Sequence, residues 1–118
     1  MSDKRKPFFS RATQMAIAPG SVFKILTAVA AIESGKMDPD MPIACRGYLD
    51  RPDQHRCSIF RHFNQGHGDT RLADALCQSC NVYFFTAARR MGPQPMVDWA
   101  SRFGIGRPTG IDLPSEAN

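Results

Sequence analysis

Residues 19 to 24 of the chain read Pro-Gly-Ser-Val-Phe-Lys, and residues 79 to 81 read Ser-Cys-Asn. The Pro-Gly pair predicts a turn after which a helix starts at Ser21. Ser21 and Lys24 lie three residues apart, so they project from one face of that helix about a turn apart. A serine hydroxyl is a weak nucleophile until a base takes its proton, and a lysine with a lowered pKa can do this. The stretch therefore predicts a nucleophile and its base at a helix start, where backbone N–H groups favour a developing oxyanion.

The apolar residues after Ser21 recur at helical spacing and are expected to face the core. They are Val22, Ile25, Leu26, Val29 and Ile32. Gly35 is the expected end of this helix.

Three further helices are predicted. The second is capped by Thr70 and ends near Gln78, the third spans residues 81 to 91 before Gly92-Pro93, and the fourth spans residues 96 to 103. The residues expected to face inward from the second and third helices are Leu72, Ala75, Leu76, Val82, Phe85, Ala88 and Met91. Residues 104 to 110 are expected to form turns, and residues 111 to 113 are at most a short strand.

The segment from Lys36 to His67 shows no sustained periodicity and is expected to be a long loop. Loops of this length are uncommon unless they are functional or held together. Three cysteines and a histidine in or near it form a ligand set that suits tetrahedral structural zinc: Cys45, Cys57, His67 and Cys80. A Cys45–Cys57 disulfide in an oxidising compartment is the competing interpretation, and the spacing does not choose between them. The fourth cysteine, Cys77, is expected to be a core thiol.

Composition limits the class of protein. The chain has 118 residues, of which 42% are hydrophobic and 22% are charged, which fits one domain with a modest core. The net charge is +4, but the longest basic run is the short stretch of residues 4 to 6, so no nucleic-acid binding is expected. No apolar stretch of about 18 residues occurs, so any membrane anchor is expected to lie outside this chain.

Ser-x-x-Lys occurs by chance in many helices, but here it is followed by Ser-x-Asn, as in the serine transpeptidases and β-lactamases. The segments around both motifs resemble the penicillin-binding protein transpeptidase domain, in family order, at residues 11–14, 19–24, 66–68, 79–85 and 103–114. The Cys-Arg-Gly-Tyr stretch at 45–48, Arg-Cys at 56–57 and Gly-His-Gly at 66–68 are most similar to penicillin-binding protein 2, the elongation-type class B group.

This resemblance implies the α+β fold of the serine transpeptidases and β-lactamases. Residues 1 to 118 would form part of that domain, mostly helical with long loops and little strand, and residues 1 to 10 are expected to be disordered or to lie outside the family domain. The implied enzyme is a peptidoglycan D,D-transpeptidase that cross-links cell-wall stem peptides through a serine acyl-enzyme.

The resemblance also assigns roles. Ser21 would attack the D-Ala-D-Ala carbonyl while Lys24 accepts its proton, Ser79 would relay protons to and from the amines, and Asn81 would hold the amide of the donor peptide. The third family motif, Lys-Thr-Gly, does not occur in the chain, since residues 108 to 110 read Pro-Thr-Gly. That strand normally supplies half of the oxyanion hole, so the isolated chain is expected to be inactive.

Some penicillin-binding protein 2 members hold zinc beside the Ser-x-Asn motif through Asp, Asp, His and Cys. Cys45, Cys57, His67 and Cys80 fall at matching positions, with cysteine in place of both aspartates. The resemblance therefore favours a structural zinc and no organic cofactor.

The implied ligands are D-Ala-D-Ala stem peptides and β-lactam antibiotics, and the implied partner is a SEDS-type glycan polymerase. The implied location is the periplasmic side of the cytoplasmic membrane. Two alternatives stay open from the residues: a β-lactamase or β-lactam sensor with the same serine chemistry, and a non-catalytic interaction module stapled by zinc.

Overall fold

The structure is a computed structural model that describes residues 9 to 112. The expectation of disorder at the start of the chain concerns residues 1 to 10, of which residues 1 to 8 lie outside the described range. The elements, in chain order, are α1 (Arg11–Gln14), the 3₁₀ turn η1 (Gly20–Val22), α2 (Phe23–Glu33), β1 (Ile43–Cys45), α3 (Ser58–Phe63), β2 (Gly68–Thr70), α4 (Leu72–Cys77), α5 (Asn81–Met91) and α6 (Pro93–Arg102).

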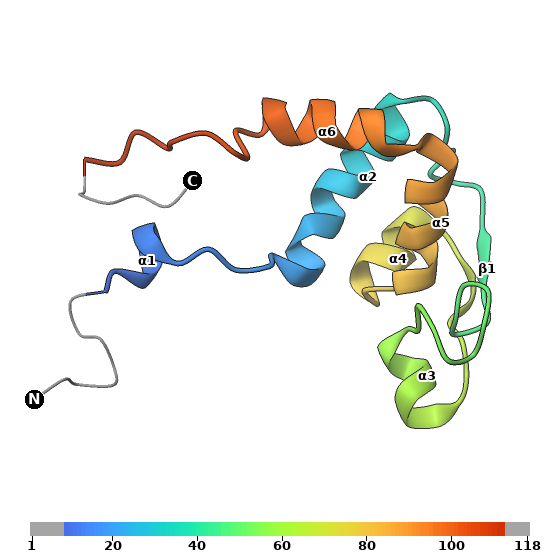
Figure 1. The fold of residues 1–118 in the computed structure, drawn as a ribbon. Helices are drawn as coiled ribbons and strands as arrows, with labels where there is room; N and C mark the ends of the chain where they lie inside the picture. The colour runs from blue at the N-terminus through green and yellow to red at the C-terminus, as the bar shows by residue number, and fades with distance from the viewer. Residues whose placement is uncertain (1–8, 113–118) are drawn as a thin grey trace, which may run out of the picture.

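Helix α2 lies at the centre of the described part of the chain. It packs against α5 and α6, and α4 joins it on the α5 side (Figure 1). Its buried face consists of small residues and one leucine, which lets the neighbouring helices approach closely: Leu26, Thr27, Ala28, Ala30 and Ala31.

The predicted inward face of α2 is therefore wrong for most of its members. Val22 is 73% exposed and Ile25 is 58% exposed, whereas Leu26 is only 5% exposed. The large apolar residues line a groove of about 300 Å³ together with Phe103 and Ile105. Apolar spacing identified the helix, but its alanines rather than most of its large apolar residues are buried in the core.

The segment from residue 36 to residue 67 contains more regular structure than predicted. Strand β1 pairs antiparallel with β2, with Ile43 opposite Thr70 and Cys45 opposite Gly68. Helix α3 follows Cys57 and ends at Asn64, which adopts the left-handed conformation. These elements are short, so their sequence periodicity is too brief to recognise.

Helix α5 has the predicted bounds and is followed by Gly92, so this prediction is confirmed. Its inward face is only partly as expected, because Val82 and Met91 are buried but Phe85 is 37% exposed. Tyr83 and Phe84 fill the core instead, at 1% and 5% exposure.

Three smaller predictions near α4 and α6 are corrected. Helix α4 is preceded by Arg71 rather than capped by Thr70, because Thr70 belongs to β2. Leu76 and Cys77 are exposed, so Cys77 is not a core thiol; Ala75 is the residue of α4 that is buried. Helix α6 starts at Pro93, a residue suited to the first helical position. Ile111 and Asp112 do not form a strand, and Leu113 lies outside the described residues.

Candidate active site and metal centre

Lys24 connects the two sequence motifs. Its Nζ donates hydrogen bonds to the Ser79 carbonyl at 2.7 Å, to Ser79 Oγ at 2.8 Å and to Asn81 Oδ1 at 2.6 Å. A lysine ammonium has three donors, so these acceptors satisfy it completely. The structure thus brings the Ser-x-x-Lys lysine onto both polar residues of Ser-x-Asn.

Ser21 completes this chain of contacts. Ser79 Oγ lies 3.0 Å from Ser21 Oγ, with hydrogen-bonding geometry. Ser21 sits in η1, two residues before α2 begins at Phe23, and its side chain is exposed. The four predicted site residues therefore lie together, and Ser79 stands between the hydroxyl of Ser21 and the amine of Lys24.

The backbone of Ser79 adopts an unusual conformation. Its φ is +53°, in the left-handed region that residues other than glycine seldom occupy. This turn separates α4 from α5 and aims both the carbonyl and the hydroxyl of Ser79 at Lys24. Such backbone strain costs on the order of 1 to 2 kcal/mol and is concentrated at functional sites.

The neighbours of Lys24 and its burial act on its pKa in opposite directions. Burial lowers the pKa of Lys24 from its ordinary value, and the nearby sulfurs of Cys57 and Cys80 partly oppose that shift because thiolates favour the ammonium. The ring of Phe84 lies 5.6 Å from Nζ and covers one side of the amine. A lysine with a lowered pKa is the kind of base that serine activation requires.

The amide of Asn81 has a fixed orientation. Its Nδ2 donates to the Arg56 carbonyl at 2.8 Å, while Oδ1 accepts from Lys24. The loop before α3 therefore orients a residue of the Ser-x-Asn motif. Sequence reasoning missed this contact, because a backbone carbonyl leaves no signal in the residue types.

The predicted metal ligands also come together. Ligand atoms of Cys45, Cys57, His67 and Cys80 all lie within 4.8 Å of one another. The Cys45–Cys57 and Cys57–Cys80 sulfur distances are 3.6 and 3.8 Å, and Cys45 Sγ lies 3.4 Å from His67 Nδ1. A zinc tetrahedron with Zn–S bonds of about 2.3 Å has S–S edges of about 3.8 Å, so the two sulfur–sulfur distances match the edges of such a tetrahedron.

Backbone and side-chain donors surround the sulfurs. The Val82 amide donates to Cys57 Sγ and the Tyr83 amide donates to Cys80 Sγ, which makes Cys80 the N-cap of α5. A hydrogen bond from the Cys80 thiol, supported by the Val82 amide, lowers the pKa of Cys57 to about 5. Its partner shows the opposite shift, because the same hydrogen bond and burial raise the pKa of Cys80. These donors favour the thiolate of Cys57, the form in which a cysteine binds a metal.

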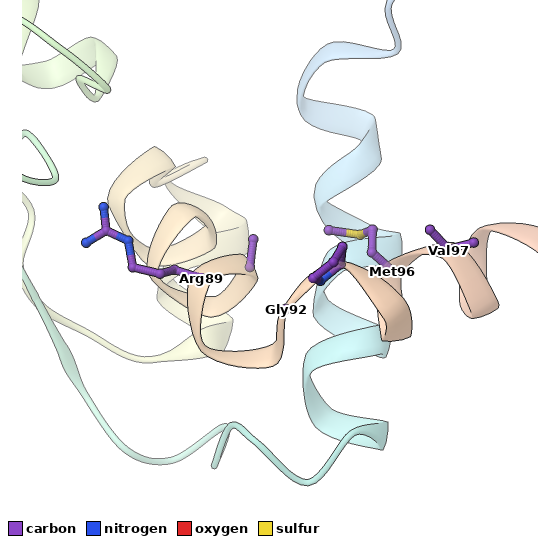
Figure 2. Close-up of a pocket in the computed structure, with 6 residues that line it drawn as sticks. Arg89, Gly92, Met96 and Val97 are labelled. Atoms are coloured by element: carbon purple, nitrogen blue, oxygen red, sulfur yellow. The ribbon is translucent and has the colours of Figure 1, made fainter.

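A hollow of about 470 Å³ lies between α5 and α6, away from these residues. Figure 2 shows Arg89 on α5 and Met96 and Val97 on α6, on either side of the Gly92 turn. Its lining is largely apolar and contains no nucleophile or metal ligand, so it is not the candidate site.

Comparisons with known proteins identify the family to which this chain is similar. The family model described as "Penicillin binding protein transpeptidase domain" matches residues 1 to 118. A protein of Acinetobacter baumannii named peptidoglycan D,D-transpeptidase MrdA is 37% identical over 95% of this chain and 16% of its own length. The Haemophilus influenzae protein of that name is 38% identical over 98% of this chain and 18% of its own length. Penicillin-binding protein PbpB of Mycolicibacterium smegmatis is 32% identical over 85% of this chain and 15% of its own length.

The chain thus spans less than a fifth of the length of these curated relatives. Within the part that the structure describes, the helices are too short or too polar to traverse a lipid bilayer.

Proposed function

Because the chain belongs to the penicillin-binding protein transpeptidase family, we propose that it supplies the nucleophile and proton-transfer residues of a peptidoglycan D,D-transpeptidase. The observation that carries this proposal is the continuous hydrogen-bonded path from Lys24 through Ser79 to Ser21. No other polar cluster in the described residues joins a hydroxyl nucleophile to a partly buried amine.

The path defines a route for the proton that leaves Ser21. In the structure Lys24 Nζ donates to Ser79 Oγ, and Ser79 Oγ donates to Ser21 Oγ. When Lys24 is neutral, both hydroxyls can turn to donate toward it, so that the proton of Ser21 passes to Ser79 Oγ and that of Ser79 passes to Lys24 as Ser21 attacks the substrate carbonyl. Because Ser79 Oγ lies within hydrogen-bond distance of both Ser21 Oγ and Lys24 Nζ, the proposal gives Ser79 a part in acylation as well. Reversal of the same path protonates the leaving D-alanine amine, and an incoming amine of a neighbouring strand repeats the cycle.

Asn81 and the start of α2 are the other groups that this chain contributes to the proposed active site. Asn81 is held by the Arg56 carbonyl and by Lys24, and its proposed role is to bind the amide of the donor peptide. The remaining oxyanion donor and the site for the substrate carboxylate belong to a Lys-Thr-Gly strand, which this sequence lacks. We therefore expect the isolated chain to be inactive, since removing one oxyanion donor alone costs about a hundredfold or more in rate.

We further propose that this segment belongs to an α+β domain whose central antiparallel sheet covers the exposed face of α2. The proposed ligands are D-Ala-D-Ala stem peptides and β-lactams, and the proposed location is the periplasmic side of the cytoplasmic membrane with a SEDS-type glycan polymerase as partner. These statements rest on the family and on the names of the relatives.

We propose zinc as the ion of the Cys3His cluster. The edge lengths fit a zinc tetrahedron, and the ligands are buried apart from partly exposed His67. The ion would join β1, the loop before α3, the start of β2 and the start of α5. Its chemistry there is structural, because a closed set of four protein ligands leaves no position for substrate.

Labelled penicillin tests the catalytic proposal. In the complete transpeptidase, Ser21→Ala is expected to abolish the covalent adduct, whereas Ser101→Ala, at an exposed serine of α6, leaves it unchanged. An adduct that persists in Ser21→Ala contradicts the proposal.

Metal analysis of anaerobically purified protein tests the zinc proposal. One zinc per chain is expected, lost in His67→Ala and retained in His62→Ala, an exposed histidine of α3. A metal content that is zero in the unsubstituted protein contradicts it.

A further inference from the structure

The sulfur of Cys57 contacts the sulfurs of both other cysteines in the cluster. Cys57 Sγ lies 3.6 Å from Cys45 and 3.8 Å from Cys80. A metal ion and a disulfide would both use these sulfurs. A sulfur that is bonded in a disulfide is no longer a thiolate, so it cannot bind the metal. The two occupants therefore exclude one another at Cys57.

We propose that Cys57 is a redox-active thiol shared between two states of one site: a metal-bound state, and a metal-free state closed by a Cys45–Cys57 disulfide. The metal-bound state rests on the zinc site proposed above, whereas the disulfide state rests on the sulfur geometry alone. The zinc site and the disulfide, which compete as interpretations of the sequence, thus become two alternative states of one cluster.

The backbone already holds the two cysteines in position. The Cys57 amide donates to the Gly47 carbonyl at 2.8 Å, and Tyr48 pairs with Arg56, so the chain between the cysteines starts and ends side by side. A disulfide bond is about 2.05 Å long, so the sulfurs need to approach by about 1.5 Å. Rotation of side chains and a small shift of the loop supply such a movement.

Cys45 is the favoured partner over Cys80. Cys80 Sγ caps α5 by accepting from the Tyr83 amide at 3.4 Å, and moving it would uncap the helix. Among the described residues, Cys45 Sγ contacts Cys57 and His67 and receives no backbone hydrogen bond. Its displacement therefore costs less.

A hydroperoxide is the oxidant that this chemistry requires. The Cys57 thiolate attacks the peroxide, the O–O bond breaks, and Cys57 becomes a sulfenic acid while an alcohol or water leaves with one proton. The Cys45 thiolate then attacks that sulfur, the S–S bond forms, and hydroxide leaves and takes a second proton. Two thiolates are oxidised and one hydroperoxide is reduced.

Burial and the metal determine when this reaction occurs. Cys45 is 2% exposed and Cys57 and Cys80 are 0% exposed, so a closed cluster admits only a small oxidant. Disulfide formation leaves His67 and Cys80, two ligands where structural zinc needs four. Because Arg56 precedes Cys57 and accepts from Asn81, movement of Cys57 also reaches the Ser-x-Asn motif.

The test uses the full chain carrying Cys77→Ser, which removes the exposed fourth thiol. Hydrogen peroxide is added to metal-free and zinc-loaded samples, and free thiols are counted and disulfides mapped by mass spectrometry. The metal-free sample is expected to lose two of its three thiols to a Cys45–Cys57 disulfide, while the zinc-loaded sample keeps all three over the same time. The oxidised sample is expected to bind zinc at least about 100-fold more weakly until a reductant is added.

A matched variant removes both partners of the proposed disulfide but keeps a ligand set. Cys45→Asp with Cys57→Asp places two carboxylates beside His67 and Cys80, and carboxylates also bind zinc. This variant is expected to retain zinc in peroxide. Unreacted thiols in the metal-free sample, a Cys57–Cys80 disulfide, or zinc binding unchanged by oxidation would overturn the proposal. Failure of the reduced protein to bind zinc overturns the metal state only, because the disulfide map comes from metal-free protein.

Discussion

The amine nitrogen of Lys24 lies 2.8 Å from the hydroxyl oxygen of Ser79, which is 55 residues further along the chain. Lys24 comes from α2 and Ser79 from the turn before α5, so the packing of these two helices sets the distance. The geometry of the site therefore depends on how the helices pack. Changes that move α5 or the loop that orients Asn81 should alter the chemistry of the site.

Loss of the Ser79 hydroxyl should slow acylation. Ser79→Ala interrupts the path between Ser21 and Lys24, and a positioned proton-transfer group contributes about 10² to 10⁴ in rate. The measurement is the second-order rate constant for acylation of the complete transpeptidase by a fluorescent penicillin. Ser79→Gly also lacks the hydroxyl but relieves the positive φ. Recovery of the rate in Ser79→Gly would show that backbone conformation, rather than the hydroxyl, is what matters.

Acylation should depend on pH through Lys24. Burial lowers the pKa of this amine, and only its neutral form accepts a proton. The rate should therefore rise with pH as Lys24 loses its proton, with a midpoint below the value of about 10.4 for an ordinary lysine. The measurement is a pH profile of acylation from pH about 5 to 10.

Lys24→Arg supplies the control for that profile. Arginine keeps the positive charge but does not deprotonate in proteins, so the rate should fall by about 10² or more and lose this rise with pH. A profile with the same midpoint in Lys24→Arg would assign the titration to another group.

Gly66 should be essential for the loop that carries His67. A Cβ added at Gly66 would lie 1.9 Å from the Cys45 carbonyl oxygen and 2.6 Å from Arg46 Cα, both of them backbone atoms. Gly66→Ala is therefore expected to lower the free energy of unfolding by about 2 kcal/mol or more and to weaken zinc binding. Denaturant unfolding measures the first effect, and Gln65→Ala, at the exposed neighbour, should change it by less than about 0.5 kcal/mol.

The exposed apolar groove beside α2 should make the 118-residue chain prone to self-association. Ile25 is 58% exposed and Ile105 is 51% exposed, and both line the groove. Replacing both with Gln should reduce hydrophobic-dye binding and the apparent mass in light scattering. Met41→Gln, at a residue that is 57% exposed and outside the groove, should have little effect. Equal effects of the two changes would show that the groove is not the surface through which the chains associate.

The sequence predicted helices better than their faces. Residues 81 to 91 form α5 as expected because Gly92-Pro93 gives a clear end signal. The inward face of α2 was predicted wrongly because large apolar residues were expected inside, whereas its alanines are buried in the core. Which face of a helix is covered depends on its partners, and local spacing contains no information about them.

For the candidate site too, the sequence predicted the residues but not the backbone geometry or the packing around them. Motif spacing indicated Ser21, Lys24, Ser79 and Asn81, and the structure places them in contact, while their catalytic roles stay predictions. The positive φ of Ser79 and the Arg56 carbonyl that orients Asn81 were missed, because backbone geometry is not encoded in residue types. The Phe84 ring beside Lys24 was missed because it depends on how α2 and α5 pack.

The most direct test of the acyl-transfer account is to map the residue that penicillin acylates. The complete transpeptidase is treated with a β-lactam, digested and examined by mass spectrometry. The account predicts one adduct, on the peptide that contains Ser21, with the fragment ions placing the added mass on that serine. An adduct on Ser79, or on any residue outside this segment, would contradict it.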